Sequence, residues 1–305
     1  MNGRRGTMGA GRTARATAVP RRVDVALARV ALAEDRWRAD RTSRRVVAPS
    51  LTARAVVEAQ AFGIVSGLGF ATAVARAGGL TVRLVRRDGD RVGPGTPVLL
   101  LEGPARSILA VERTLLNGLM HASGIATLTA RFVERARAVR PAFEIWATRK
   151  TLPGLRDLEK AAVVHGGGRP HRRDLAEALL LKTNHLALVP LARAVARARR
   201  ARRPRERVEV EVRSPAEALE AVRAGADALL LDNTPPRTAR RIVDALRRAG
   251  VRDRLWIEVS GGVDLSNIAA YARSGADAAS VGRLTHSAPS LPFHLVLRRS
   301  RSPRR

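Results

Sequence analysis

Lysine is rare in this chain, and its positions mark the segment with the most chemical promise. Three of the 56 basic residues are lysine, at Lys150, Lys160 and Lys182, and all the others are arginine. A chain that otherwise uses arginine should keep lysine where a compact, mobile ammonium does what a planar guanidinium cannot. Lys150 and Lys182 are therefore candidate site residues. Lys160 falls inside an expected helix and is interpreted as structural.

Further basic groups come from segments near the two candidate lysines. Arg149, Lys150, His171, Arg172 and Lys182 lie in three neighbouring segments that contain few carboxylates. Arginine suits two-pronged contacts to a carboxylate, and lysine acts as a point charge. The cluster predicts a substrate with more than one negative charge, and ordinary surface salt bridges are the simpler alternative.

Two carboxylates end neighbouring apolar segments later in the chain. Glu211 and Asp232 could hold ribose hydroxyls or a Mg²⁺ ion, or they could stabilise a developing cation, since hard oxygen ligands suit Mg²⁺. A structural ion pair with arginine is the alternative. Glu209 and Glu258 are expected to be such structural partners.

Glycine-rich loops follow the last two apolar segments. Ser260-Gly261-Gly262 and Gly282 could present backbone N–H groups to a phosphate, with His286 just beyond, although tight turns would use the same residues. The histidines show no zinc-ligand spacing, so no transition-metal site is expected.

Six short apolar segments in the second half must position these groups, and each ends in polar or glycine residues. They are expected as strands at 144–148, 178–181, 208–212, 227–231, 256–259 and 277–281. Polar groups at strand ends indicate an α/β fold, either a (β/α) barrel with a catalytic mouth or a doubly wound open sheet. A repeat, 224–228 and 274–278, favours the barrel.

The first half has a different character. Strand-like segments and Gly/Pro turns predict a small α+β domain, and a helical period from 104 to 140 is expected to break at Ser123-Gly124. We predict a basic disordered extension at 1–22, an N-terminal domain at 23–116, a barrel at 117–283 and a basic tail at 298–305. Residues 284–297 are expected to complete the N-terminal domain.

Composition limits the function further. The chain has 305 residues, 45% of them hydrophobic, a net charge of +29 and no cysteine. It contains no apolar run long enough to span a membrane. The absence of cysteine fits a reducing cytoplasm. Nucleic-acid binding is the less favoured interpretation, because aromatic residues do not interleave the arginines; a field that attracts small anions is preferred.

Eight ordered motifs resemble quinolinate phosphoribosyltransferase, also called nicotinate-nucleotide pyrophosphorylase (carboxylating), over residues 23–297. They are Glu112-Arg113-Thr114-Leu115-Leu116-Asn117, Ser123-Gly124-Ile125-Ala126-Thr127, Thr148-Arg149-Lys150-Thr151-Leu152-Pro153-Gly154, Gly166-Gly167-Gly168 with His171-Arg172, Glu209-Val210-Glu211, Leu231-Asp232-Asn233, Ser260-Gly261-Gly262, and Ser280-Val281-Gly282 with Thr285-His286-Ser287.

The resemblance implies an N-terminal α/β sandwich and an open (β/α) barrel of the type II phosphoribosyltransferase kind, in a homodimer or dimer-based assembly whose subunits share their sites. Quinolinate would be bound by residues matching Arg113 of the neighbouring subunit, Thr148, Arg149, His171, Arg172 and Lys182. Phosphoribosyl pyrophosphate and Mg²⁺ would be bound by residues matching Lys150, Glu211, Asp232, Ser260, Gly261, Gly262, Gly282 and His286.

The reaction implied by the resemblance is phosphoribosyl transfer to quinolinate with decarboxylation, in NAD biosynthesis. Lys150, Glu211 and Asp232 would be catalytic, and Mg²⁺, held by Glu211 and Asp232 in the family pattern, would be the cofactor. No membrane or nucleic-acid partner is expected, and the expected location is the cytoplasm.

Three positions depart from the family pattern. Thr183 stands where Asp is usual in Lys-Asp-Asn-His, Leu152 replaces a common Thr, and Ala39-Asp40-Arg41-Thr42 is a loose Gly-Asp-x-Thr. A related branch, the molybdenum-transport-associated ModD proteins, commonly lacks the equivalent of Lys182, so Lys182 favours quinolinate. A paralogue acting on another acid and a non-catalytic arginine-rich binding protein remain the alternatives.

Overall fold

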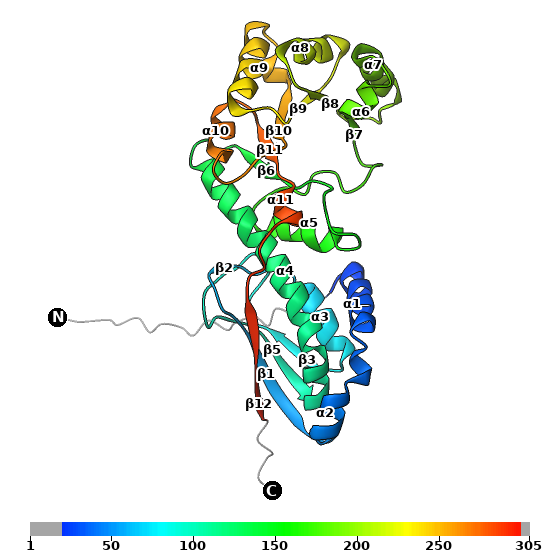
Figure 1. Cartoon of the computed structure of the whole chain (residues 1–305), viewed down its shortest axis with the longest axis vertical. Coiled ribbons are helices and arrows are strands. Elements are labelled where there is room, and N and C mark those ends of the chain that lie inside the picture. Colours follow the sequence, from blue (N-terminus) through cyan, green and yellow to red (C-terminus); the bar gives the residue numbers. More distant parts are fainter. Residues whose placement is uncertain (1–19, 300–305) are drawn as a thin grey trace, which may run out of the picture.

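Two lobes lie along one long axis and are joined by a single long helix. A computed structural model of the protein describes residues 20–299. The helix, α4 (Ala105–Arg137), runs from the lower lobe into the upper one (Figure 1). Of the predicted extension and tail, residues 1–19 and 300–305 lie outside the described residues. The first helix, α1 (Arg22–Glu34), already begins at the end of the predicted extension.

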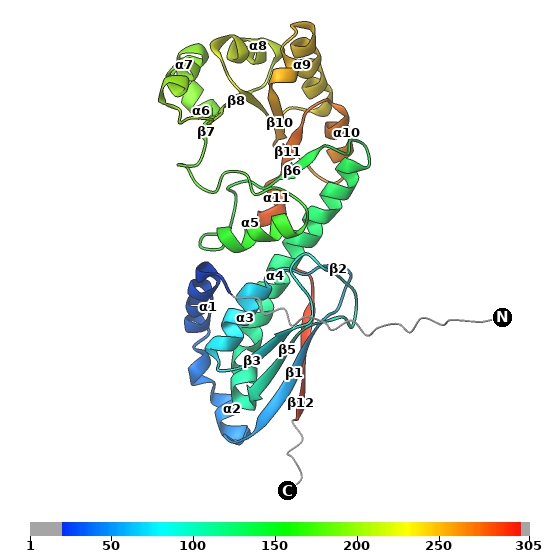
Figure 2. The ribbon, with the colours of Figure 1, turned by 180° about the vertical axis from the view of Figure 1, so that it is seen from behind.

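The lower lobe is built on a four-stranded antiparallel sheet. Its order is β12 (Phe293–Arg299), β1 (Thr52–Ala59), β5 (Pro97–Pro104) and β3 (Thr81–Leu84). In β1, Ala53, Ala55, Val57 and Ala59 are buried and alternate with more exposed residues, which makes one apolar face. Seen from behind, α1, α3 (Leu68–Ala77) and α4 gather on one side of these strands (Figure 2).

Short elements complete this lobe. They are η1 (Trp37–Ala39), α2 (Arg41–Val46), β2 (Gly63–Ile64) and β4 (Arg91–Val92). Asp40 caps α2 by accepting hydrogen bonds from the backbone N–H groups of Thr42 and Ser43, so the loose Gly-Asp-x-Thr string is a helix start.

The predicted helix break at Ser123-Gly124 is wrong, because α4 is continuous there. Both residues serve close packing instead. A Cβ on Gly124 would lie 2.1 Å from the carbonyl oxygen of Pro289, so only glycine lets the returning chain pass. The Ser123 hydroxyl binds the backbone of Ser66. The predicted domain boundary at 116/117 also falls inside this helix, so the two lobes share it.

All six predicted strands of the second half form one parallel sheet. Its order is β6 (Glu144–Trp146), β11 (Ala278–Ser280), β10 (Trp256–Ser260), β9 (Ala228–Asp232), β8 (Val208–Val212) and β7 (Leu179–Leu181). From β7 to β11 the strands follow chain order without reversal, whereas a doubly wound sheet reverses its order at a switch point. Within the described residues β6 and β7 do not pair, so the barrel is open.

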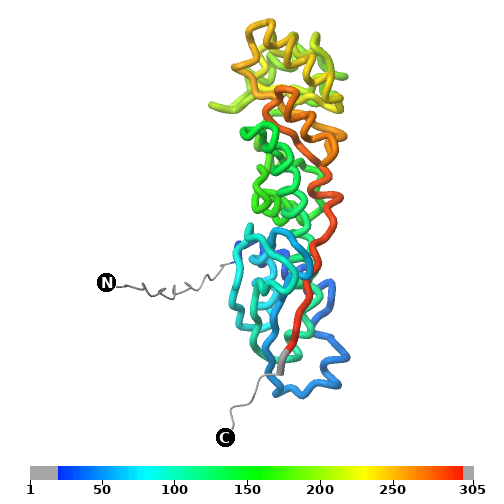
Figure 3. Tube along the Cα trace, turned by 90° about the vertical axis from the view of Figure 1, so that its left-hand side faces the viewer, coloured from blue at the N-terminus to red at the C-terminus, as the bar shows by residue number. Residues whose placement is uncertain are grey.

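Four helices cover the outside of this barrel, namely α7 (Leu191–Ala201), α8 (Pro215–Ala224), α9 (Pro236–Arg248) and α10 (Ile268–Arg273). The remaining elements of this lobe are α5 (Arg156–His165), which packs against α4, and the short α6 (Thr183–Leu186), η2 (Arg252–Arg254) and α11 (Arg283–His286). After α11 the chain descends beside α4 and enters the lower sheet as β12 (Figure 3). Among the described helices none is both long enough and apolar enough to cross a membrane.

Candidate active site

The carboxyl-terminal edge of the parallel sheet collects the predicted carboxylates and lysines, and we call this edge the barrel mouth. The strand register places Ser260 opposite both Asp232 and Ser280, so three strand ends lie at one level. Glu211 lies on β8 and Lys182 directly follows β7. Residues far apart in the chain therefore meet because parallel strands end together.

Lys182 and Glu211 form the central charge pair of the barrel mouth. The Lys182 ammonium lies 3.0 Å from Glu211 Oε1, and the carboxylate is 8% exposed. Burial alone would raise the pKa of Glu211, but the Thr183 backbone N–H, at 2.6 Å from Oε2, and the Lys182 ammonium hold that pKa below its usual value. Glu211 is therefore an anion near neutral pH.

Thr183, the departure from the family pattern, also binds this carboxylate. Its hydroxyl lies 3.1 Å from Glu211 Oε2. An aspartate at this position would place a second negative charge beside Glu211, whereas threonine supplies a hydrogen bond. Threonine at position 183 therefore favours the ionised form of Glu211 and places no second carboxylate beside it.

Asp232 is held by a residue that the sequence reasoning missed. Arg213 lies 3.4 Å from Asp232 Oδ2 and 3.3 Å from the Thr183 hydroxyl, so it links the two strand ends. Asn233 donates to the same Asp232 oxygen at 3.0 Å. Arg213 directly follows β8, and that position at a strand end was the signal that could have revealed it.

A small cavity of about 340 Å³ lies beside the barrel mouth, and we call it the glycine cavity. Its lining includes Lys150, Gly261, Gly262, Gly282 and His286. A Cβ on Gly282 would lie 2.9 Å from Lys150 Cδ and 3.2 Å from His286 Nε2, so glycine is needed for these side chains to approach. The backbone N–H groups of these glycines and the Lys150 ammonium together suit a phosphate.

The sequence reasoning missed one basic member of the glycine cavity. Arg283 also lines it and opens α11, directly after Gly282. The Thr285 hydroxyl donates to the Lys150 carbonyl oxygen at 2.7 Å, which ties the loop after β6 to α11. Thr148 and Lys150 belong to that loop, and the Lys150 N–H donates to the Thr148 hydroxyl at 3.0 Å.

A second cavity, of about 480 Å³, opens inside the barrel, and we call it the interior cavity. His171, Arg172, Glu209, Trp256 and Glu258 are among its lining residues. Burial raises the pKa of Glu209 well above its usual value, and the nearby Glu258 raises it further. The expectation that these two glutamates pair with arginine is not met, because within residues 20–299 no arginine forms a salt bridge with either of them, and the buried oxygens of Glu258 accept no hydrogen bond there.

Geometry alone would allow a cation between His171, Glu209 and Glu258, whose ligand atoms lie within 4.8 Å of one another. The histidine tautomer disfavours it. His171 Nδ1 accepts the Arg172 backbone N–H at 2.6 Å, so Nε2 carries the proton and faces Glu258 at 3.5 Å. A metal-bound histidine instead donates from its second nitrogen.

Two arginines of the predicted cluster are available to bind an anion. Arg149 and Arg172 make no salt bridge with any carboxylate of the described chain, and the buried Arg149 Nε has no hydrogen-bond partner there. Burial lowers the pKa of Arg172, and the adjacent Arg149 lowers it further. The two neighbouring guanidinium groups repel each other, and a multiply charged anion bound beside them would offset this repulsion.

Arg113 is the predicted residue that this chain does not bring to the barrel mouth. It is exposed in the first third of α4, where it lines a cavity of about 440 Å³ with Asp35, Asn117 and His121. Those neighbours belong to the lower lobe and to the part of α4 beside it.

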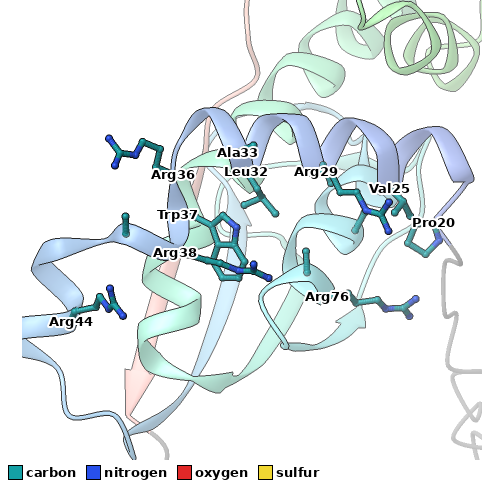
Figure 4. A pocket seen from close by; sticks show the side chains of 14 residues that line it. Pro20, Val25, Arg29, Leu32, Ala33, Arg36, Trp37, Arg38, Arg44 and Arg76 are labelled. Atoms are coloured by element: carbon teal, nitrogen blue, oxygen red, sulfur yellow. The ribbon is translucent and has the colours of Figure 1, made fainter.

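A cavity of about 990 Å³, larger than the three described above, lies elsewhere, between α1 and α3 (Figure 4). Its floor is aliphatic, with Leu32 and Ala73, and the Trp37 ring lies under Arg38 at 5.1 Å. We call it the arginine groove after five lining residues, Arg29, Arg36, Arg38, Arg44 and Arg76. Its lining contains no carboxylate and no glycine, so it is not the predicted site.

Sequence comparison assigns the chain to a family. Residues 40–123 match the family model "Quinolinate phosphoribosyl transferase, N-terminal domain", and residues 125–296 match the model of the C-terminal domain. The chain belongs to the quinolinate phosphoribosyltransferase family. The resemblance drawn from the eight motifs is thereby confirmed.

Individual relatives agree with this assignment. A probable nicotinate-nucleotide pyrophosphorylase [carboxylating] of Archaeoglobus fulgidus is 42% identical over 248 residues, which are 81% of this chain and 95% of that protein. The rat nicotinate-nucleotide pyrophosphorylase [carboxylating] is 36% identical and covers 83% of this chain and 84% of its own length. The crystal structure of NadC from Streptococcus pyogenes superposes with a TM-score of 0.85 at 36% identity, covering 93% of this chain and 99% of that one.

Proposed function

We propose that this chain is a carboxylating nicotinate-nucleotide pyrophosphorylase, a pentosyltransferase of NAD biosynthesis. It transfers phosphoribose from phosphoribosyl pyrophosphate to quinolinate and releases nicotinate mononucleotide, pyrophosphate and CO₂. One observation carries the proposal beyond family membership. The glycine cavity and the unpaired Arg149 and Arg172 form two distinct anion-binding regions, with Glu211 and Asp232 at the strand ends beside them.

The two regions suit the two substrates. The backbone N–H groups around Gly261 and Gly282, with Lys150, suit the phosphates of phosphoribosyl pyrophosphate. Arg149, His171, Arg172 and Lys182 suit the adjacent carboxylates of quinolinate, since guanidinium groups bind carboxylates through two parallel hydrogen bonds. Thr148 lies at the start of the loop that carries Arg149 and Lys150.

The carboxylates at the barrel mouth suit the charge that develops during transfer. As the pyridine nitrogen attacks the anomeric carbon and pyrophosphate leaves, positive charge grows on the ribose ring. Glu211, kept ionised by its low pKa, and Asp232 stabilise that charge. No side chain forms a covalent bond in this scheme, and positioning supplies much of the rate.

Decarboxylation follows from the product of transfer. The ring nitrogen of quinolinate mononucleotide is cationic, so it accepts the electron pair released when the bond to the 2-carboxylate breaks. Carbon 2 then takes a proton, and nicotinate mononucleotide results. Arg149 and Arg172 hold the carboxylates and fix the orientation of the pyridine ring during this step.

Magnesium belongs to the proposal as a partner of the pyrophosphate. Both Glu211 oxygens already bind Lys182 or Thr183, which leaves that carboxylate little capacity for a metal. Asp232 Oδ1 accepts no hydrogen bond from residues 20–299, so Asp232 fits Mg²⁺ better. The ion would neutralise charge on the leaving group, and Mg²⁺ commonly binds through one or two carboxylates plus substrate phosphates.

A dimer with shared sites is the third part of the proposal. Arg113 lies outside the barrel mouth of its own chain and is exposed on α4. An exposed arginine there can complete the quinolinate site of a second copy, as the family resemblance implies. The predicted cytoplasmic location stays a prediction.

A turnover assay tests this function directly. The purified chain with quinolinate, phosphoribosyl pyrophosphate and Mg²⁺ should release CO₂ and nicotinate mononucleotide, and chelation of the metal should stop the reaction. A panel of other pyridine and planar acids tests the paralogue alternative. Product from another acid but none from quinolinate would reject the proposal. Salt-sensitive DNA binding without any turnover would favour the binding-protein alternative.

A further inference from the structure

Lys160, the third lysine, is buried and has an unusual partner. Its residue is 5% exposed in α5, and its ammonium donates a hydrogen bond to the carbonyl oxygen of Pro170. No carboxylate of the described residues lies within salt-bridge distance of it. Burial of a charge without a counter-ion is unfavourable, because the ammonium loses its hydration and gains no ion pair, so this position calls for a functional reason.

The contact fixes the segment that carries His171 and Arg172. Arg169 exchanges backbone hydrogen bonds with Ile145 and Ala147 beside β6, which anchors one side of Pro170. Proline has no N–H, so its carbonyl is the only backbone polar group through which Pro170 can be held. The Lys160 ammonium binds this carbonyl, which belongs to the residue immediately before His171.

His171 needs such a hold because its backbone is strained. Its φ of 51° lies in the left-handed region, which is unfavourable for a residue other than glycine and persists only where the surroundings enforce it. On the far side, Arg172 donates from its guanidinium to the Ala178 carbonyl oxygen at 3.2 Å. The His171–Arg172 turn is therefore fixed from both ends.

The charges around Lys160 connect it to an anionic substrate. Burial, and after it the charges of Arg156 on its own helix, Arg149 and Arg172, together lower the pKa of Lys160 to about 8, while Glu177 opposes them. Two of these arginines are the unpaired ones assigned to quinolinate. A dianion bound beside them would offset the repulsion and favour the protonated lysine.

We propose that Lys160 is a positioning residue for quinolinate: it holds the Pro170 carbonyl so that His171 and Arg172 face the substrate, and its ammonium adds to the field that receives the dicarboxylate. The role rests on the proposed function. The positioning role also explains why this arginine-rich chain keeps a lysine here. A compact ammonium on an unbranched side chain can reach one carbonyl oxygen in a closed space, whereas a planar guanidinium would leave several of its donors without partners there.

Lys160→Met, which keeps the length and removes the charge, is the principal test. The KM for quinolinate should rise about tenfold, the scale of one lost hydrogen bond from a charged donor. The KM for phosphoribosyl pyrophosphate should stay within about twofold, because Lys160 does not line the glycine cavity. Arg240→Met, which removes one exposed charge from α9 outside the site, is the matched control.

Proton uptake separates positioning from simple stabilisation. At pH 8, titration calorimetry of quinolinate in buffers of different ionisation enthalpy should show proton uptake by the unaltered chain and none by Lys160→Met. Quinolinate affinity of the unaltered chain should also fall as the pH rises through about 8, although both substrate carboxylates remain ionised. This profile tests the role even if Lys160→Met fails to fold.

The outcomes distinguish this role from the proposed function. If the unaltered chain neither binds nor converts quinolinate, the proposed function is wrong and this role falls with it. If the unaltered chain converts quinolinate while Lys160→Met shows the same quinolinate KM and the same proton uptake, only the positioning role is overturned. Equal weakening of both substrates would likewise overturn it in favour of general stabilisation.

Discussion

The barrel mouth and the arginine groove are both lined by positive charge, but they differ in what holds that charge in place. In the barrel mouth Lys182 pairs with Glu211 and Arg213 pairs with Asp232. Within residues 20–299 none of the five guanidinium groups of the arginine groove pairs with a carboxylate. Fixed cations beside ionised acids can stabilise a changing charge distribution, whereas free arginines only attract anions.

The comparison also explains why net charge is a poor guide to the site in this protein. The arginine groove, which is larger than the glycine and interior cavities, lies in the lower lobe. Lys150 and Arg172 nevertheless line the two smaller cavities of the barrel, and Glu211 and Asp232 lie at its strand ends. Catalysis depends on groups held in place before the reaction begins. The predictions below test this difference between the two regions, beginning with the largest effect.

Removal of Lys182 should have the largest effect. Lys182→Ala takes a cation from quinolinate and leaves Glu211 without its partner, so kcat/KM should fall about a thousandfold, the scale seen when one member of a charge pair is truncated. Release of labelled CO₂ from quinolinate measures it. A loss below about tenfold, or an equal loss in Arg29→Ala of the arginine groove, would remove the distinction between the two regions.

Arg113 tests whether a second copy completes the barrel mouth. Arg113→Ala should lower kcat/KM about a hundredfold, as expected for a lost arginine–carboxylate contact. Mixing it with Lys182→Ala under conditions of subunit exchange should restore about a quarter of the unaltered activity, because half of the dimers then contain one intact site. Activity that does not recover on mixing, although subunit exchange is demonstrated, would contradict shared sites.

The glycine cavity should tolerate no added methyl group at Gly282. Its φ is ordinary, so Gly282→Ala introduces no backbone strain and acts only by pushing Lys150 and His286 away. The KM for phosphoribosyl pyrophosphate should rise about tenfold through this misplacement, with the quinolinate KM nearly unchanged. Steady-state kinetics in both substrates measures the change. An effect on quinolinate alone would show that the two substrates are assigned to the wrong cavities.

The lowered pKa of Glu211 makes a small contribution to stability with a defined sign. Because the folded pKa lies below the ordinary value of 4.5, the stabilisation is complete above that value and disappears as the pH falls through the folded pKa. Lys182 is half exposed, so the contribution should be about 1 kcal/mol or less. Thermal midpoints of the unaltered chain and Glu211→Gln should therefore converge on acidification; parallel curves would contradict the assignment.

The arginine groove should show the smallest effect. Arg29→Ala combined with Arg76→Ala should leave kcat/KM within about twofold, since neither residue touches the barrel mouth. The thermal midpoint should stay the same or rise slightly, because the change relieves repulsion among like charges. A large loss of turnover would mean that this groove takes part in catalysis.

Much of the candidate site could be predicted because its signals are local. The rarity of lysine marked Lys150 and Lys182, and short apolar segments ending in polar residues located all six strands of the barrel. Strand ends in a parallel sheet meet at one edge whatever the details of packing. The α/β fold class, the glycine cavity and the two carboxylates at the strand ends followed from that rule.

Other features depended on which distant groups come into contact. Ser123-Gly124 carries a local signal for a helix break, but the close passage of Pro289 uses the same glycine for packing. Arg213 follows an expected strand end, but only the tertiary structure shows that it lies between Thr183 and Asp232. Likewise, no spacing rule places the Lys160 ammonium against the Pro170 carbonyl.

The sequence by itself determined most of the elements, the family and most of the residues that line the candidate site. Only the tertiary structure decided which charges are paired, which are buried and which lie away from the barrel mouth, as Arg113 does. The physical reason is that backbone preferences and hydrophobic periods act over a few residues. Ion pairing and burial depend on strand register and loop paths that join positions tens to hundreds of residues apart.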